Sequence, residues 1–302
     1  MGVGTRGGLA ALVVACAGSC SLALPLDGLS GGSAPGGPDA AQDVLTSDGD
    51  AGDAGDATTS TDAGGDAEAG DAGVQETSDA PSNAYRTAVL TDSPLAYWRL
   101  GEASGAVCHD ETGNGNDATI VGNVTLGVPG ALTGDPDTAA HFPGSGGLLD
   151  VGDRFDFAGT APLTFEMWCK PDVIDTSYRH LETKMKYDDA GRPFDGTYLF
   201  VHAGTTLGYE RWSDGGTDLG MSSPLVTVGS YWHVVATYDG STANLYVNGA
   251  LAQSAPTAVA LVANGVHLAW GELYQGSLDE LAVYDHALTL QRVLAHYQAA
   301  TQ

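Results

Sequence analysis

Residues 110–117 form an acidic, glycine-containing segment whose side chains could bind a metal ion. The segment reads Asp-Glu-Thr-Gly-Asn-Gly-Asn-Asp, so it combines carboxylate and amide oxygens with turns that expose backbone carbonyls. Calcium binds about six to eight such oxygens in proteins. The segment is not an EF-hand loop, because no bidentate glutamate stands at the twelfth position. The alternative is that Asp110 and its neighbours cap a loop by accepting backbone N–H groups.

Aromatic residues beside polar turns indicate a second kind of chemistry, the binding of a sugar. Aromatic rings stack on the faces of sugars, while polar groups bind the hydroxyls and fix orientation. Trp212 is followed by the polar turn Ser-Asp-Gly-Gly at 213–216. The predicted ligand-binding set is Tyr187, Tyr209, Arg211 and Trp212. A second candidate pair is Trp270 and Tyr274. Packing in a hydrophobic core is the alternative for both sets.

The carboxylates lack the spacing that glycoside hydrolysis requires. A retaining glycosidase needs two carboxyl groups about 5–5.5 Å apart, which alternate positions on one strand could provide. No Glu-x-Asp-x-Glu run occurs, and Glu166 has no carboxylate two residues away. Asp279 and Glu280 are adjacent, and neighbours on a regular strand face opposite sides. The histidines show neither HxH nor HExxH spacing. The sequence therefore predicts a protein that is not an enzyme.

The segments around these candidates have the pattern of short β-strands. Residues 163–169 alternate, and the side chains that would share one face are Leu163, Phe165, Met167 and Cys169. Residues 244–249 end in Asn-Gly, a strong signal for a hairpin with a type I′ turn. Further strand-like segments occur at 198–202, 231–238 and 266–270. Their spacing is typical of β-sandwiches.

The C-terminal region predicts a closing strand followed by a helix. Residues 278–285 alternate like a strand, with Leu281 and Val283 on one face. Thr289 is a suitable N-cap, because its hydroxyl can accept an N–H of the first helical turn. The predicted apolar stripe of the helix is Leu290, Val293, Leu294 and Tyr297. Helical periodicity appears only here, so the predicted fold is an all-β, two-sheet antiparallel sandwich with a short C-terminal helix.

Several of these segments resemble the laminin-G-like, concanavalin A-type jelly-roll domains of bacterial surface proteins. The similar segments are 96–102, 110–118, 142–146, 163–171, 231–240 and 245–249, together with the C-terminal strand and helix. The resemblance implies a jelly roll whose first and last strands adjoin. It also implies that Asp110, Asn114 and Asp279 hold a structural calcium ion at that seam. It does not imply one function, because this fold serves lectins, adhesins, proteoglycan binders and glycosidases.

Residues 1–26 predict an export signal. Arg6 precedes an apolar run at 9–15 that is too short to span a bilayer of about 30 Å. Residues 13–16, Val-Val-Ala-Cys, resemble a bacterial lipobox, which implies lipidation of Cys16. The alternatives are lipidation of Cys20 and an ordinary secretory signal without a lipid.

The two remaining cysteines, Cys108 and Cys169, stand in the part of the chain that predicts strands. Export leads to an oxidising compartment, where pairs of cysteines form disulfides. We therefore expect a disulfide between them, with two buried free thiols as the alternative.

Residues 27–83 predict a disordered acidic tether, and residues 84–302 predict one globular domain. The stretch from Asp27 to Asp79 has 13 acidic residues and no basic one, and its Asp-Ala-Gly repeats contain almost nothing that could be buried. The rest of the chain is also acidic, and the net charge is −27. This charge argues against nucleic acid as a partner, and against a membrane except through a lipid anchor.

Together these features predict a non-enzymatic, exported module that binds a ligand. The module is expected at the cell envelope, held by a lipid anchor, and the alternative is a secreted protein. The expected ligand is an extracellular polysaccharide or a surface protein. One alternative is a structural envelope protein without a soluble ligand. The other is a glycoside hydrolase built on the same fold.

Overall fold

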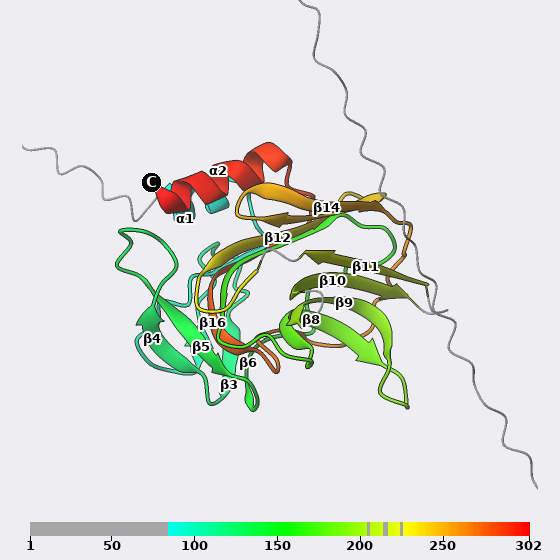
Figure 1. Cartoon of the computed structure of the whole chain (residues 1–302), viewed down its shortest axis with the longest axis horizontal. Coiled ribbons are helices and arrows are strands. Elements are labelled where there is room, and N and C mark those ends of the chain that lie inside the picture. The colour runs from blue at the N-terminus through cyan, green and yellow to red at the C-terminus, as the bar shows by residue number, and fades with distance from the viewer. Residues whose placement is uncertain (1–83, 204–205, 214–216, 224–225) are drawn as a thin grey trace, which may run out of the picture. The chain divides into compact units, whose positions relative to one another are not determined.

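The computed structural model describes residues 84–302, apart from 204–205, 214–216 and 224–225. These residues form two antiparallel sheets and two helices (Figure 1). The predicted sandwich with a short C-terminal helix is confirmed. The export signal, Cys16, Cys20 and the acidic tether lie outside the described residues. Within the described part, no helix combines the length and apolarity needed to cross a membrane.

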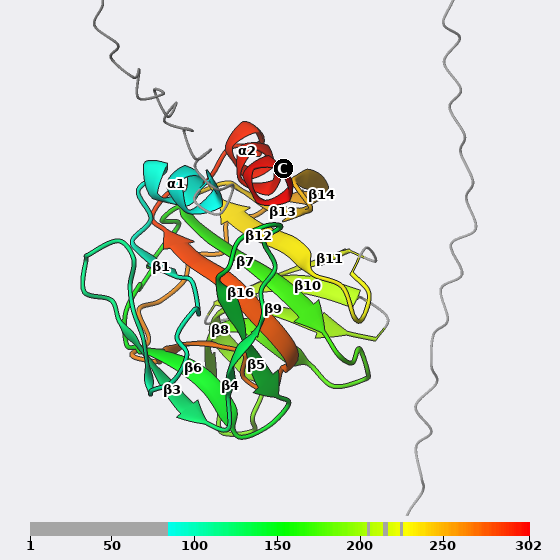
Figure 2. The same ribbon diagram turned by 90° about the vertical axis from the view of Figure 1, so that its left-hand side faces the viewer.

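The first sheet, sheet A, has the hydrogen-bonding order β14-β13-β12-β7-β16-β5-β4, and β1 pairs with β16 beside this path. Its strands are β1 (Ala96–Trp98), β4 (Thr125–Pro129), β5 (Thr138–Pro143), β7 (Leu163–Pro171), β12 (Trp232–Tyr238), β13 (Thr242–Val247), β14 (Ala250–Pro256) and β16 (Gln275–Tyr284). The last strand, orange in Figure 2, lies between β7 and β5. Its pairing with β1 joins the first and last strands, as the resemblance implied.

The second sheet, sheet B, has the order β11-β10-β9-β8-β15-β6-β3-β2. Its strands are β2 (Val107–Cys108), β3 (Ala118–Gly122), β6 (Gly147–Gly152), β8 (Arg179–Tyr187), β9 (Pro193–His202), β10 (Thr206–Ser213), β11 (Thr217–Ser223) and β15 (Leu268–Trp270). Strands β8 to β11 follow one another through consecutive antiparallel pairings. Alternate side chains of these strands therefore share either the inner or the outer face of the sheet.

The main hydrophobic core lies between the two sheets. Trp98 from sheet A meets Trp270 from sheet B edge to face, with ring centroids 6.3 Å apart. On β9, Leu199 belongs to this core, whereas the neighbouring Tyr198 lies in a separate cluster on the outer face of sheet B. The predicted inward-facing set on β7 is confirmed by the burial of Leu163, Phe165, Met167 and Cys169 in the main core.

Helices α1 (Ala84–Thr91) and α2 (Leu290–Thr301) form a second core with the outer face of sheet A (Figure 1). The expectation of a helix only at the C-terminus was wrong, because α1 precedes the first strand. With eight residues, α1 makes only about two turns, too few for its two buried positions to stand out as a period.

The predicted start of α2 is confirmed, but its predicted apolar stripe is only partly correct. The hydroxyl of Thr289 accepts a hydrogen bond from the backbone N–H of Arg292, as expected for an N-cap. The helix buries Val293, His296 and Ala300. Exposed apolar residues of the predicted stripe are Leu290 (48%) and Leu294 (40%). A polar residue, His296, therefore occupies the centre of the buried face.

Strand β16 contains a bulge that the sequence did not predict. Its register against β7 shifts between Asp279 and Ala282, and Glu280 has a φ of +53°. Because a bulge inserts an extra residue, the alternation of a regular strand is lost there. Asp279 and Glu280 are both buried, so they are not divided between a buried and an exposed face.

The predicted hairpin at Asn248-Gly249 is confirmed, with both residues at positive φ between β13 and β14.

Candidate functional site

The outer face of sheet B carries a cluster of aromatic side chains, which we call the aromatic platform. Its members are Tyr178, Tyr187, Tyr198, Phe200 and Trp212. Strand pairing brings them together, because Thr183 of β8, Tyr198 of β9 and Glu210 of β10 stand in one cross-strand row. Met185 and Trp212 stand in the next row, on either side of Gly196. Residues far apart in the sequence thus form one surface.

The platform has a buried lower layer and an exposed upper layer. Tyr198 and Phe200 are only 5% and 2% exposed, and their ring centroids lie 5.1 Å apart. Tyr178 lies against this layer, 4.8 Å from the Phe200 centroid, and remains 47% exposed. Gly208 of β10 allows the close approach of Phe200, since a Cβ at position 208 would lie 2.2 Å from its Cζ. The exposed ring therefore rests on a packed support.

Glu210 fixes the orientation of two rings of the platform. Its Oε2 accepts hydrogen bonds from the hydroxyl of Tyr198 and from Nε1 of Trp212, both at 2.8 Å. Burial, together with the bond to Glu210, raises the pKa of Tyr198. Trp212 is tied at its edge in this way and stays partly exposed. The acceptor thus holds the indole in one orientation on the outer face.

A pocket of about 350 Å³ adjoins the platform between β6, β15 and β8. Its lining residues are Leu148, Asp150, Thr183, Met185, Tyr187, Val266, His267, Ala269 and Glu272. Asp150 contacts Nδ1 of His267 at 2.9 Å, and Glu272 lies 3.5 Å from Nδ1 of His180. Tyr187 links the pocket to the platform, and burial followed by the charge of Glu272 raises its pKa. The volume is within the range of small-molecule sites, about 300–1,000 Å³.

The structure divides the predicted ligand-binding set. Trp212 and Tyr187 lie on the outer face of sheet B, where Tyr187 is 42% exposed. Tyr209 and Arg211 were wrongly assigned, because both are 0% exposed and lie between the sheets. The guanidinium carbon of Arg211 lies 3.8 Å from the ring centroid of Tyr238. Strand alternation separates positions 209 and 211 from position 212. The second candidate pair is also fully buried, namely Trp270 and Tyr274.

Most residues of this surface were not predicted as site residues. They are Tyr178, Tyr198, Phe200, Glu210, Asp150, His267 and Glu272. One signal was present, because Tyr198, Phe200 and His202 alternate with apolar residues and share one face of their strand. That pattern does not say which face is covered by the other sheet. Only the pairing of the sheets decides it.

Two of the predicted calcium ligands make contacts within their own loop and the adjoining strand. The carboxylate of Asp110 accepts hydrogen bonds from the backbone N–H groups of Tyr97, Thr112 and Asn116, and from the hydroxyl of Thr112. The side-chain amide of Asn114 donates to the carbonyl of Leu95. These bonds are the loop-capping contacts that the alternative interpretation expects.

The third predicted ligand, Asp279, lies in an acidic surrounding at the seam of the first and last strands. Its Oδ2 accepts the backbone N–H of Ala131, while its buried Oδ1 has no hydrogen-bond partner among the described residues. Burial, followed by the charge of Glu280, raises the pKa of Asp279 well above its usual range. The residues that pair with Arg99 at this seam are Asp135, Asp137 and Glu280, at 2.7–3.0 Å.

None of these contacts joins Asp110, Asn114 and Asp279 to one another. Among the described residues, no group of three or more His, Cys, Asp or Glu side chains is placed to hold a metal ion. Of the three, Asp279 has a carboxylate oxygen that could still accept a cation. Calcium binding at these residues stays a prediction.

Both cysteines of the domain are buried free thiols. Cys108 lies on β2 at the edge of sheet B, and Cys169 lies on β7 inside sheet A. The structure thus has the alternative arrangement in place of the expected disulfide. Burial raises the pKa of Cys169 to about 12, so this thiol stays protonated and unreactive.

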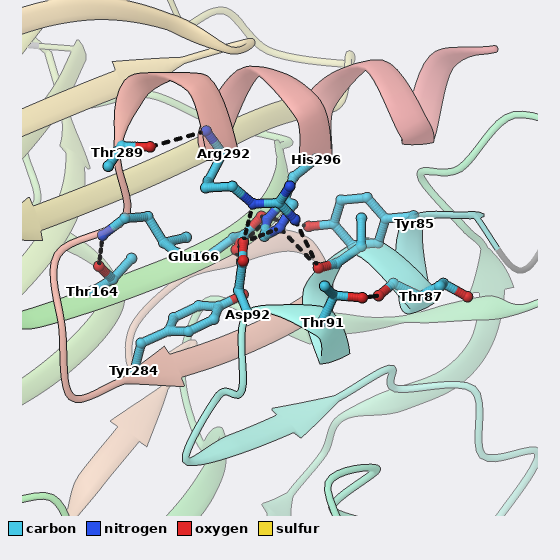
Figure 3. Close-up of polar contacts among 12 residues, drawn as sticks. Tyr85, Thr87, Thr91, Asp92, Thr164, Glu166, Tyr284, Thr289, Arg292 and His296 are labelled. Atoms are coloured by element: carbon cyan, nitrogen blue, oxygen red, sulfur yellow. Dashed lines mark hydrogen bonds and ion pairs between the residues drawn. The ribbon is translucent and has the colours of Figure 1, made fainter.

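A second group of polar side chains surrounds Glu166 of β7, beneath the two helices (Figure 3). Its carboxylate accepts hydrogen bonds from Tyr85 of α1 (3.0 Å), Tyr284 of β16 (2.8 Å), His233 of β12 (2.8 Å) and His296 of α2 (2.9 Å). A carboxylate with histidines and tyrosines has the composition of a catalytic site. However, Glu166 and both histidines are 0% exposed, so a substrate has no access to them. This group joins the helices to sheet A.

The contacts of His296 require its doubly protonated form. Nδ1 faces the Glu166 carboxylate, while Nε2 lies 2.9 Å from the carboxylate of Asp92 and 3.1 Å from the carbonyl of Ala88. Both nitrogens face acceptors, and only an imidazolium can donate from both. Burial acts to lower the pKa of His296, but the charge and hydrogen bond of Glu166 raise it overall. Burial acts to raise the pKa of Glu166, but the two histidines hold it well below its usual range.

Comparison with known proteins identifies the family of this domain. A family model described as the concanavalin A-like lectin/glucanases superfamily matches residues 143–294, half of the chain. The chain belongs to this superfamily. The match confirms the jelly-roll family that the sequence resembled. No curated protein sequence matches the chain.

Solved structures with the same fold include the following three domains. The binding domain of Paraclostridial mosquitocidal protein 1 has a TM-score of 0.55 and 15% identity, over 69% of this chain and 52% of that one. The second structure is domain 4 of AbnA, a GH43 extracellular arabinanase from Geobacillus stearothermophilus, in complex with arabinotriose. It has a TM-score of 0.50 and 18% identity, over 69% of this chain and 98% of that one. The botulinum neurotoxin serotype D ligand binding domain, in complex with N-acetylneuraminic acid, has a TM-score of 0.52 and 15% identity, over 70% and 52%.

At these identities the likeness to the three structures shows the fold alone. The chain spans about half the length of the mosquitocidal and botulinum structures that it matches, and nearly the whole of the AbnA domain. The superfamily therefore fixes the architecture, while the ligand must be argued from the site itself.

Proposed function

We propose that residues 84–302 form a non-enzymatic carbohydrate-binding module of the concanavalin A-like superfamily, with its ligand site on the outer face of sheet B. The observation that carries this proposal is the exposure of Tyr178 and Tyr187 and the partial exposure of Trp212 beside the packed rings of Tyr198 and Phe200, next to a pocket of about 350 Å³. Exposed aromatic rings that are already fixed lose little conformational freedom on binding. They offer flat apolar faces for sugar rings, while the pocket offers polar groups for hydroxyls.

The structural neighbours support a binding role. Two of the matched structures are binding domains by name, and a third, the AbnA domain, was solved with arabinotriose. The proposed ligand is an extracellular polysaccharide. Binding to a surface protein, or a purely structural role in the envelope, would appear in the same experiments as a failure to bind any glycan.

We also propose that the protein is exported and held at the cell envelope by lipid on Cys16. This rests on the lipobox-like residues 13–16 and on the acidic segment 27–83 between them and the domain. A flexible segment of some 60 residues has a root-mean-square reach of roughly 40–50 Å, and repulsion between its like charges extends it further. Such a tether would hold the binding face away from the membrane.

The proposed site is tested by measuring polysaccharide affinity for the full chain and for Trp212→Ala and Tyr178→Ala, by affinity electrophoresis over a panel of soluble glycans. We expect at least one glycan to bind, and each variant to bind it about tenfold more weakly or worse, a loss of roughly 1.4 kcal/mol. Leu251→Ala is the matched control, because Leu251 is 49% exposed on β14 of the other sheet. Unchanged affinity in both aromatic variants, or release of reducing sugar by the wild type, would contradict the proposal.

A further inference from the structure

Apart from histidine, the charged side chains described at the proposed site are carboxylates. Three carboxylates stand there, since Asp150 and Glu272 line the pocket and Glu210 holds Trp212. Among the described residues that line the pocket or form the aromatic platform, none is a lysine or an arginine. The whole chain is strongly acidic as well, with a net charge of −27. A ligand at this face therefore meets a negative potential.

The basic side chains nearest in sequence to the platform are engaged elsewhere. Arg179 pairs with Asp175, Arg192 pairs with Asp188, and Lys186 lies over the ring of Phe194. Two basic residues of this region lie between the sheets: Lys184 pairs with the carboxylates of Asp153 and Asp156, and Arg211 lies over the ring of Tyr238. None of these contacts leaves a cation directed at the platform or its pocket.

Neither His267, which lines the pocket, nor His180, which lies beside the lining residue Glu272, reverses the charge of the pocket. His267 makes its contact with Asp150, and His180 lies beside Glu272. Each imidazole is therefore already next to a carboxylate that would offset its proton. A ligand carboxylate placed in the pocket would find no unopposed positive group among these side chains.

The hydrogen-bonding capacity of the site also favours an uncharged ligand over one that carries carboxylates. Ionised carboxylates only accept hydrogen bonds, whereas hydroxyl groups donate and accept. Asp150 and Glu272 are therefore matched by the hydroxyls of an uncharged sugar. The carboxylate of an acidic sugar is itself only an acceptor, so against Asp150 or Glu272 it would donate no hydrogen bond and would add repulsion between like charges.

We propose that this site binds uncharged stretches of polysaccharide and discriminates against glycans that carry carboxylates. This inference rests on the proposed function, because it specifies the ligand class of the same site. Asp150 and Glu272 are the residues that determine the discrimination. The aromatic platform supplies binding to either class, and the carboxylates decide between them.

The test compares matched polymers that differ only in charge. Soluble arabinan, galactan, xylan, glucan and mannan are used as they are, and after partial oxidation of their primary hydroxyls to carboxylates where the sugar has them. Dissociation constants are measured for the full chain at low ionic strength and at about 1 M salt, where the Debye length falls to about 3 Å. We expect the uncharged form of the bound polymer to bind at least tenfold more tightly at low salt, and the ratio to shrink at high salt.

Two variants test whether the pocket carboxylates cause the discrimination between oxidised and uncharged polymers. Asp150→Asn combined with Glu272→Gln should strengthen binding of the oxidised polymer at least fivefold relative to the uncharged one. Asp285→Asn is the matched control, because Asp285 is an exposed carboxylate on the loop after β16, and it should leave the ratio unchanged.

The outcomes separate this inference from the proposed function. If the oxidised polymer binds as tightly as the uncharged one or more tightly, and Trp212→Ala abolishes that binding, the proposed charge selectivity is wrong but the proposed binding site is supported. Selectivity that persists in the double variant also overturns the role of Asp150 and Glu272. If no polymer binds in either form, or if binding ignores Trp212→Ala, the proposed function itself has failed.

Discussion

The buried group around Glu166 predicts a large loss of stability for a nearly isosteric substitution, Glu166→Gln. The carboxylate accepts four donors from α1, β12, β16 and α2, whereas a glutamine has one acceptor oxygen and places an N–H₂ group among the remaining donors. The substitution also leaves His296 without one of its two facing carboxylates. Removing one partner of a buried ion pair costs about 3–5 kcal/mol.

For a domain of this size, each kcal/mol lowers the melting temperature by about 2–4 °C, so the expected decrease is roughly 6–20 °C. Melting is followed by near-ultraviolet circular dichroism, with urea denaturation to obtain the free energy of unfolding. Glu111→Gln is the matched control, since the side chains of Glu111 and its partner Arg86 are both about one-third exposed. We expect Glu111→Gln to lower the free energy of unfolding by no more than about 1 kcal/mol.

The same substitution predicts a pH dependence with a defined sign. The pKa of His296 is raised, so its contribution is complete below about pH 6.5 and is lost as the pH rises through the raised pKa. The pKa of Glu166 is lowered, so its contribution is complete above about pH 4.3 and is lost as the pH falls through the lowered pKa. The difference between wild type and Glu166→Gln should therefore peak at about pH 5–6.5 and shrink in alkali. A loss no larger than that of Glu111→Gln, or one that is independent of pH, would refute this account.

Two further predictions concern the platform and the seam. Gly208→Ala should destabilise the domain by about 1–3 kcal/mol and weaken glycan binding, because the new Cβ would collide with the Phe200 ring. The measurements are thermal melts and glycan titrations. Gly220→Ala on the next strand is the control and should change neither stability nor binding, because a Cβ there meets nothing within 4 Å. Millimolar calcium should raise the melting temperature, by the equivalent of about 2.7 kcal/mol at a hundredfold excess over Kd, and Asp279→Asn should abolish the shift. The absence of any shift between calcium and chelator would remove the metal from the seam.

Much of the fold follows from patterns that span only a few residues. The alternation at 163–169 predicted the inward face of β7, Asn248-Gly249 predicted a hairpin, and Thr289 predicted the start of α2. Each of these depends on the period of a strand, the φ preference of a turn or one capping hydroxyl. Local chemistry is sufficient in such cases, so the sequence by itself determined the class of fold and several of its elements.

The site depended on contacts that no local pattern contains. Tyr209 and Trp212 are three residues apart, and only the packing of sheet B against sheet A made one a core residue and the other part of the outer face. Glu166 is bound by residues 67 to 130 positions away, so its surroundings could not be recognised from neighbouring carboxylates. The bulge at Asp279 and Glu280 likewise arises from pairing with distant strands. The sequence determined which residues alternate, and the tertiary structure decided which alternate set stays exposed, because that depends on which face the other sheet covers.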